Sequence, residues 1–315
     1  MANTTPVGRK CFGGSGYQGE FHVDDALVCP GKIFWCGNNI TGASDAVEYG
    51  TSPATPFATL DYAYSACTTG RCDTVFVMPG HAESIATAAA SPAFDLADVR
   101  VIGLGVGNSR PTFTFTHADA TFAVTAANNV IRNLKFVSNV ANCVTGITAS
   151  AAADGLIVED CFFTDSSVIT ELLIAISLAA NCDYCIIRRN HFFAHVAAAT
   201  GATTSAIVLV GESAHTEIYD NFAYGHYITD ILNAAVTVTG LWVVRNNFNN
   251  IDSDAGIAYT GAAGTEGVLA WNFMGGGKNG TSPNAEVTKT FCMQNFGCDV
   301  PACSGLITPA VCVIA

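Results

Sequence analysis

Charged residues are scarce in this sequence, and basic residues are the scarcest. Lys and Arg together number 13 among 315 residues, against 26 Asp and Glu, so the formal net charge is −13. Proteins that hold DNA or RNA directly neutralise several phosphates with a clustered basic surface. A chain this poor in basic residues does not provide such a surface, and we expect no direct nucleic-acid partner.

Long apolar runs are missing as well. No window contains the ~20 apolar residues of a membrane-spanning helix, and residues 1–16 lack the apolar stretch of a signal peptide. We therefore expect no membrane partner and synthesis in a cytosol. The composition also excludes intrinsic disorder, because half of the residues are apolar and 19 Phe and 9 Tyr are present.

Cysteine, in contrast, is abundant. The 13 Cys are an odd number, so at least one thiol is unpaired or pairs between chains. Cys182 and Cys185 have the spacing of half a zinc site, but no matching Cys/His pair follows at a finger-like distance. Most Cys therefore read as small buried apolar residues. The candidate disulfide residues, should the protein meet an oxidising exterior, are Cys67, Cys72, Cys292, Cys298, Cys303 and Cys312.

One short pattern recurs through the chain: apolar or β-branched residues, a polar pair ending in Asn or Asp, then an aromatic. Its Asn/Asp positions are 23–31 residues apart, at Asn133, Asp160, Asn190, Asn221, Asn247, Asn272 and Asn295. A second β-branched row begins at Ile147, Ile176, Ile207, Val236 and Ile257. Two short strand signals therefore repeat in phase, and coils of this length with two or three strands are typical of a parallel β-helix.

The alternatives are a helical repeat and a leucine-rich repeat. The segments are too short and too often broken by Gly, Asn, Asp and Ser for helices, and no leucine ladder is present. We therefore predict an all-β fold, a single-stranded right-handed parallel β-helix over residues 51–296. A short capping helix near residues 56–66 would cover its open first coil. Residues 1–50 would form an irregular attachment arm, and residues 297–315 a Cys-containing C-terminal cap.

Stacked coils place equivalent residues above one another. The Asn/Asp row predicts a structural ladder at a bend, in which each side chain bonds backbone in the next coil; its members are Asn133, Asp160, Asn190, Asn221, Asn247 and Asn272. The aromatic row predicts an internal stack of Phe136, Phe163, Phe193, Phe248, Phe273 and Phe296.

Sugar-cleaving chemistry would need two carboxyl groups across one bond. Candidates by residue type are Asp160, Asp165, Asp220, Asp230, Asp252 and Asp254, but no Asp-Asp pair, Gly-His-Gly or Arg-x-Lys marks them. Stacked histidines could bind a metal or titrate together; the four near coil ends are His191, His195, His215 and His226. Surface or partly buried roles are commoner, so we predict no catalytic residue, cofactor or metal.

Four segments carry a resemblance to a known family: residues 56–63 (PFATLDYA), 73–83 (DTVFVMPGHAE), 103–105 (GLG) and 110–111 (RP). They resemble the opening of right-handed β-helix proteins encoded by tailed bacteriophages, and with the coils the resemblance covers roughly residues 50–300. That family includes tailspikes that bind or cleave polysaccharide, and head decoration or cement proteins.

This chain departs from typical tailspikes, because it lacks a long head-binding domain, a coiled-coil tail and a marked carboxylate pair. The resemblance therefore implies a non-enzymatic capsid decoration protein on the virion surface, a homotrimer whose partner is the major capsid protein. The alternative is a tail spike or fibre protein that binds or cleaves a host surface glycan.

Overall fold

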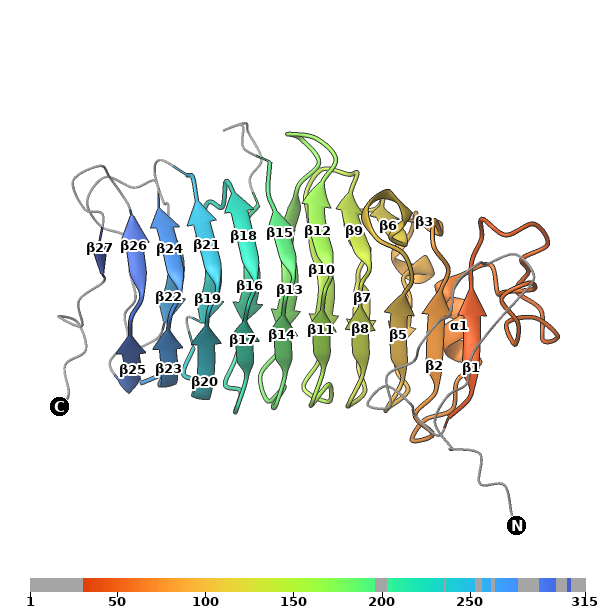
Figure 1. Ribbon diagram of the computed structural model, residues 1–315, viewed down its shortest axis with the longest axis horizontal. Coiled ribbons are helices and arrows are strands. Elements are labelled where there is room, and N and C mark those ends of the chain that lie inside the picture. The colour runs from red at the N-terminus through yellow and green to blue at the C-terminus, as the bar shows by residue number, and fades with distance from the viewer. Residues whose placement is uncertain are drawn as a thin grey trace, which may run out of the picture.

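Each sequence repeat forms one coil of a parallel β-solenoid (Figure 1). The computed structural model describes residues 31–195, 203–234, 236–252, 257–261, 264–276, 289–298 and 305–306. Three sheets run along the solenoid, and each coil contributes one strand to each sheet in turn. Seven coils contain all three strands, so the prediction of an all-β parallel solenoid is confirmed.

Sheet 1 has ten strands, all parallel to their neighbours. They are β1 (Ile33–Cys36), β2 (Thr74–Val77), β5 (Arg100–Gly103), β8 (Val130–Arg132), β11 (Ile157–Glu159), β14 (Ile186–Arg188), β17 (Glu217–Tyr219), β20 (Thr239–Val244), β23 (Glu266–Ala270) and β25 (Lys289–Met293).

Sheet 2 also has ten strands, of which only the last, β27, is antiparallel to its neighbour. They are β3 (Ala82–Ile85), β6 (Thr112–Phe115), β9 (Lys135–Ser138), β12 (Phe162–Asp165), β15 (His191–Phe193), β18 (Phe222–Gly225), β21 (Asn247–Asn250), β24 (Phe273–Gly276), β26 (Phe296–Cys298) and β27 (Gly305–Leu306).

Sheet 3 has seven strands and closes each coil. They are β4 (Ala93–Phe94), β7 (Phe122–Val124), β10 (Cys143–Ala149), β13 (Leu172–Leu178), β16 (Ser205–Leu209), β19 (Asp230–Ala234) and β22 (Ile257–Gly261).

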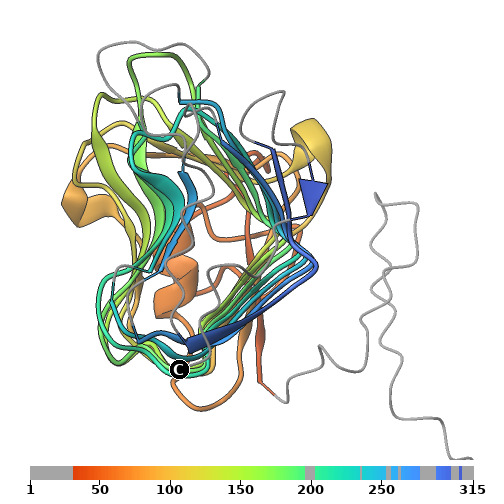
Figure 2. The ribbon, with the colours of Figure 1, turned by 90° about the vertical axis from the view of Figure 1, so that its left-hand side faces the viewer.

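From β8 onward, the bend between sheet 1 and sheet 2 contains two residues and forms a sharp corner when the solenoid is viewed along its axis (Figure 2). The first bend residue has a left-handed backbone with φ between 49° and 56°; in successive coils it is Asn133, Asp160, Arg189, Asp220, Arg245, Trp271 and Gln294. The second is buried; it is Leu134, Cys161, Asn190, Asn221, Asn246, Asn272 and Asn295. Apart from Gly, Asn and Asp tolerate the left-handed conformation best. Where another residue type occupies the first bend position, its left-handed backbone must be held in place by the surrounding coils.

The buried asparagines form a ladder. Asn221 accepts the Asn190 N–H at its Oδ1 (3.0 Å) and donates from Nδ2 to the Ile187 carbonyl (2.9 Å). The same pair of bonds recurs in the coils of the other four ladder residues. Each side chain therefore satisfies backbone of the preceding coil, not of the next coil as the sequence suggested.

The predicted ladder combined residues from three structural positions: the first bend residue, the second bend residue and the first residue of the following strand. Asn190, Asn221 and Asn272 lie in the ladder, but Asn133 and Asp160 occupy the first bend position. Asn247 points outward from β21, because the strand register aligns it with Phe222 and places Asn246 beside Asn221. A pattern aligned on any Asn or Asp cannot separate adjacent positions whose side chains point in opposite directions.

Aromatic rings fill the interior beneath sheet 2. Phe136 stacks on Phe163 with centroids 4.8 Å apart, and Phe163 on Phe192 at 5.1 Å, close to the ~4.8 Å spacing of paired strands. Ala223, Phe248 and Met274 continue this row.

Half of the predicted aromatic stack was wrong. Phe136, Phe163 and Phe248 lie in the interior, but Phe193, Phe273 and Phe296 are 40%, 43% and 50% exposed. Each exposed ring is the sequence neighbour of the residue that points inward, and adjacent strand residues face opposite sides of a sheet.

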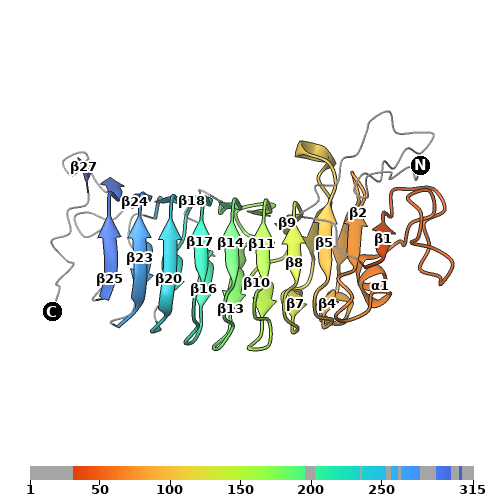
Figure 3. The same ribbon diagram turned by 60° about the horizontal axis from the view of Figure 1, so that its bottom comes forward.

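The N-terminal coils carry the helix α1 (Leu60–Ser65), within the predicted range (Figure 3). Thr59 caps it by accepting the Tyr62 N–H, and Leu60, Ala63 and Tyr64 are buried in the solenoid core. Its role as a cap for the open first coil stays a prediction. Two short 3-10 helices cover Ala88–Ala90 and Gly107–Ser109.

The ends of the solenoid differ from the simplest reading of the sequence. Strand β1 pairs with β2, so sheet 1 begins at Ile33, inside the segment expected to be an irregular arm. The predicted C-terminal cap over residues 297–315 lies almost wholly outside the described residues. None of the helices in the described ranges has the length and apolarity needed to span a membrane.

Candidate functional site

An ionic ladder lies on the outer surface of sheet 1 and its bend. Arg132, Glu159 and Arg188 are in register on neighbouring strands, and Asp160 and Arg189 stack beside them at the bend. Glu159 accepts from Arg188 at 2.6 Å and from Arg189 at 2.7 Å, and Asp160 accepts from Arg189 at 2.8 Å and from Arg132 at 3.1 Å. Opposite charges on adjacent strands stabilise such stacks.

The ladder continues to Asp220 and Arg245, whose Nε–Oδ1 distance is 2.7 Å. Burial alone would raise the pKa of Asp160, but the Arg189 and Arg132 contacts outweigh it and hold that pKa below its ordinary value. The Arg245 hydrogen bond likewise lowers the pKa of Asp220. A catalytic acid needs a raised pKa, so these carboxylates are suited to structure rather than to proton donation.

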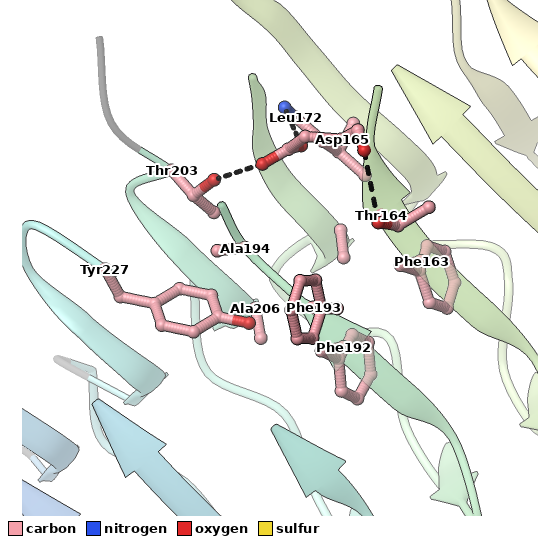
Figure 4. A pocket seen from close by; sticks show the side chains of 11 residues that line it. Phe163, Thr164, Asp165, Leu172, Phe192, Phe193, Ala194, Thr203, Ala206 and Tyr227 are labelled. Carbon is pink, nitrogen blue, oxygen red and sulfur yellow. Dashed lines mark hydrogen bonds between the residues drawn. The ribbon is translucent and has the colours of Figure 1, made fainter. Parts of the chain in front are cut away.

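Asp165 has the opposite environment, at a small cavity between sheets 2 and 3 (Figure 4). Its Oδ1 accepts the Leu172 N–H (2.8 Å), and its Oδ2 accepts the His195 N–H (3.2 Å) and the Thr203 hydroxyl (3.4 Å). Burial raises its pKa to about 6, which would suit a general acid.

The cavity beside Asp165 is small. Its volume is about 10 Å³, room for roughly one water molecule. Its other lining residues are apolar or carry hydroxyl groups, so no second carboxyl group faces Asp165 there. The carboxyl group instead holds together backbone from β12, β13 and the segment before β16.

The four histidines singled out in the sequence are not brought together. His191 points outward from β15, His195 donates its backbone N–H to Asp165, and His215 stacks on Tyr184. His226 Nε2 lies 2.9 Å from Asp252 Oδ2. The stacked arrangement that a shared metal ion would require is therefore not formed by these residues.

A different group, Cys36, His81 and Glu83, has ligand atoms within 4.8 Å of one another, and is the one such group of three in the described part of the chain. Asn38 N–H donates to His81 Nδ1 (3.1 Å), so the ring hydrogen lies on Nε2 and donates to Glu83 Oε2 (3.0 Å). Both ring nitrogens are occupied, and this hydrogen-bonding pattern opposes metal binding.

The role of this group is to join the first coil to α1. Glu83 Oε2 also accepts the N–H of Leu60, the first residue of the helix, at 3.0 Å. Burial raises the pKa of the Cys36 thiol well above its ordinary value, which makes it a poor nucleophile. The contacts within this group and with α1 give these residues a structural explanation.

Cys67 and Cys72, two of the candidate disulfide residues, are not bonded to each other in the structure. Both are free thiols, and Cys67 donates to the Ala63 carbonyl at 3.6 Å. Cys292 lies in β25 and is partly buried. The side chain of Cys298, and Cys303 and Cys312 entirely, lie outside the described residues.

The outer surface of sheet 2 is the feature that remains unexplained by packing within the chain. Its strands carry outward-facing rings in register, which we call the aromatic face: Phe162, His191, Phe193, Phe222, Tyr224, Phe273 and Phe296. The ring centroids of His191 and Phe222 are 5.7 Å apart, and Phe193 stacks on Tyr224 with ring centroids 5.9 Å apart. Contiguous exposed apolar surface of this kind marks interaction sites.

The aromatic face is also free of acidic side chains, in a chain with a net charge of −13. The remaining outward residues on β9 to β24 are Lys135, Val137, Thr164, Asn247, Asn249 and Gly275. Sequence reasoning missed this face because it assigned one inward aromatic to each coil. The adjacent pairs Phe162–Phe163 and Phe192–Phe193 were the available signal, since one ring of each pair must face outward.

No comparison with known proteins shows a family for this chain. No protein-family model matches the sequence, and no curated protein matches it. Among solved structures, a rhamnogalacturonan lyase superposes with a TM-score of 0.48 at 12% sequence identity, over 85% of this chain and 74% of that chain. At this identity the likeness says nothing about activity or substrate.

Proposed function

We propose that this chain is a non-enzymatic structural protein of a bacteriophage virion, located on the capsid surface, where it binds the major capsid protein as a decoration or cement protein. The phage assignment rests on the sequence resemblance. The aromatic face carries the proposal of a binding role, because it is a broad, rigid surface that the described residues leave exposed. The paired carboxylates and the small cavity at Asp165 support a role without catalysis.

Exposed rings favour binding because covering them removes apolar surface from water, at roughly 25 cal/mol per Å². The parallel backbone fixes their positions, so little conformational freedom is lost when a partner docks. A homotrimer, and an attachment arm at the N-terminus, complete the proposal. Because β1 begins at Ile33 within sheet 1, the arm is best tested by removing residues 1–30 only.

The test uses particles stripped of this protein, to which purified chain is added back. Replacing Phe222 and Phe273 by Ser should weaken particle binding about tenfold or more, or ~1.4 kcal/mol. The matched control is Trp242→Ser, which removes a ring that is somewhat more exposed (52%, against 38% for Phe222 and 43% for Phe273) from sheet 1. Wild-type affinity in the double variant would contradict the proposal, provided its thermal unfolding is unchanged.

A second candidate function is binding of a host surface polysaccharide by a tail spike or fibre. The specific observation in its favour is a line of outward rings on sheet 2, since ring faces accommodate the apolar faces of sugars. Retention on immobilised host polysaccharide, lost in the Phe222→Ser/Phe273→Ser variant, would favour this candidate. Release of oligosaccharide from that polysaccharide would contradict both proposals of a non-enzymatic role.

A further inference from the structure

Cys182 and Cys185 bring two buried sulfur atoms into contact. They lie in the turn between β13 and β14, both side chains are fully buried, and their Sγ atoms are 3.2 Å apart. A covalent disulfide has an S–S distance of about 2.05 Å. The two sulfurs therefore need to approach by only about 1 Å to become bonded.

The turn that carries them is held from both sides. Asp183 donates its N–H to Asp154 Oδ1 in the preceding coil (2.9 Å), and its Oδ1 accepts the Ala214 N–H from the following coil (2.6 Å). Tyr184 N–H donates to the Ala214 carbonyl (2.8 Å). Groups fixed in this way react with each other as if at high local concentration, because little freedom remains to be lost.

A structural zinc site is the main alternative for such a pair, and its surroundings do not fit. The one group of three close metal-ligand side chains in the described ranges is Cys36, His81 and Glu83, elsewhere in the molecule. Two thiolates alone leave a tetrahedral zinc ion half coordinated. Both thiols also point to the Ala153 carbonyl (3.5 and 3.8 Å), as the thiols of Cys143 and Cys161 point to other carbonyls, but only Cys182 and Cys185 have an Sγ–Sγ contact given among the described residues.

We propose that Cys182 and Cys185 form an oxidisable pair that closes to an intramolecular disulfide when the protein meets an oxidising exterior. The oxidant is a low-molecular-weight disulfide, RSSR. One cysteine loses its proton and attacks RSSR, which forms a mixed disulfide and releases RS⁻. The second cysteine displaces the other RS⁻, and the two protein protons yield two RSH. The cysteines are oxidised and RSSR is reduced, with two electrons transferred.

Oxidation of this pair should be slow at neutral pH. The Cys182 contact and burial both raise the pKa of the Cys185 thiol, and the thiolate is the attacking species. The rate should therefore increase as the pH rises. Once closed, the bond should resist reduction for as long as the turn stays folded.

The experiment incubates the folded full-length chain with oxidised glutathione or with dithiothreitol, then denatures, alkylates and maps it by mass spectrometry. After oxidation the peptide that contains both cysteines should lose about 2 Da and remain unalkylated. After reduction it should carry two alkyl groups. Cys143 should be alkylated in both samples.

Thermal unfolding gives the second readout. Oxidation should raise the melting temperature of the wild type and of Cys143→Ala, and should leave that of Cys182→Ala unchanged. Two alkyl groups on the pair after prolonged oxidation at pH 8.5 would overturn the proposal. Accumulation of a stable glutathione adduct on one cysteine, or retention of stoichiometric zinc after chelation, would overturn it too.

Discussion

The outer surfaces of sheet 1 and sheet 2 adjoin at one bend, and in the central coils their chemistry differs. Near the bend, sheet 1 carries an ionic ladder in which Glu159 and Asp160 are each bound by arginines of neighbouring coils. Sheet 2 carries exposed rings that contact mainly one another. Stacking of coils brings opposite charges into contact, but it leaves the outer faces of stacked rings exposed to water. In the central coils the charges of sheet 1 are therefore paired within the chain, whereas the rings of sheet 2 stay exposed among the described residues.

The largest expected effect separates the two sides of sheet 2. Phe163→Ala empties a buried position and should lower the free energy of unfolding by about 3–5 kcal/mol. Phe162→Ala, at the adjacent outward position, should change it by less than about 1 kcal/mol. Urea unfolding of both variants measures the difference. Equal losses would mean that the aromatic face is held by packing within the chain.

Two carboxyl groups on β12 and its bend should respond oppositely to pH. The pKa of Asp165 is raised from 3.8 to about 6, so its contribution to stability is complete below about pH 3.8 and is lost as the pH rises through about 6. At about 1.4 kcal/mol per pKa unit, the loss is at most ~3 kcal/mol. The pKa of Asp160 is lowered, so its contribution is present above pH 3.8 and lost as the pH falls.

Substitution by Asn distinguishes the two groups. Asp165→Asn should remove the decline in unfolding free energy between pH 4 and 7, and Asp160→Asn should reduce the loss of stability in acid. Urea unfolding at pH 3, 4, 5.5 and 7 tests both variants. Parallel pH profiles for the two variants would show that the environments of these carboxyl groups have been misassigned.

In the ionic ladder, the cost of removing an arginine should increase with the burial of the ion pairs that it forms. Arg189→Ala takes one partner from nearly buried Glu159 and from Asp160, and should cost ~1–2 kcal/mol, because Arg189 is partly exposed. Arg245→Ala breaks a pair that is more exposed on both sides, and should cost about 0.5 kcal/mol or less. Added salt should reduce the difference between the stability costs of the two substitutions. An equal cost for both would contradict the distinction.

The repeat and its parallel pairing could be predicted from sequence because each coil repeats the same short strand signals. The side on which each residue lies could not. The two-residue bend, with its left-handed first position, shifts the inward–outward alternation of side chains by one residue. The sequence pattern therefore assigned Asn247 rather than Asn246 to the asparagine ladder, and Phe193 rather than Phe192 to the interior stack. Strand register decides such cases, and it is set by pairing across about 25–30 residues.

The group of Cys36, His81 and Glu83 at the first coil was equally hard to predict from the sequence. Cys36 and His81 are 45 residues apart, and only the pairing of β1 with β2 brings them together. Residues 31–50 gave no repeat signal, since β1 has no bend asparagine and is followed by a long irregular connection. The aromatic face was hidden for a different reason, because a phenylalanine in a strand pattern reads as core by default.

A reconstruction of the assembled phage particle tests the central claim most directly. Our account predicts that the chain sits on the capsid with Phe222 and Phe273 buried against the major capsid protein, while Arg189 and Arg245 face solvent. A reconstruction in which the aromatic face points into solvent and the ionic ladder forms the contact would contradict it.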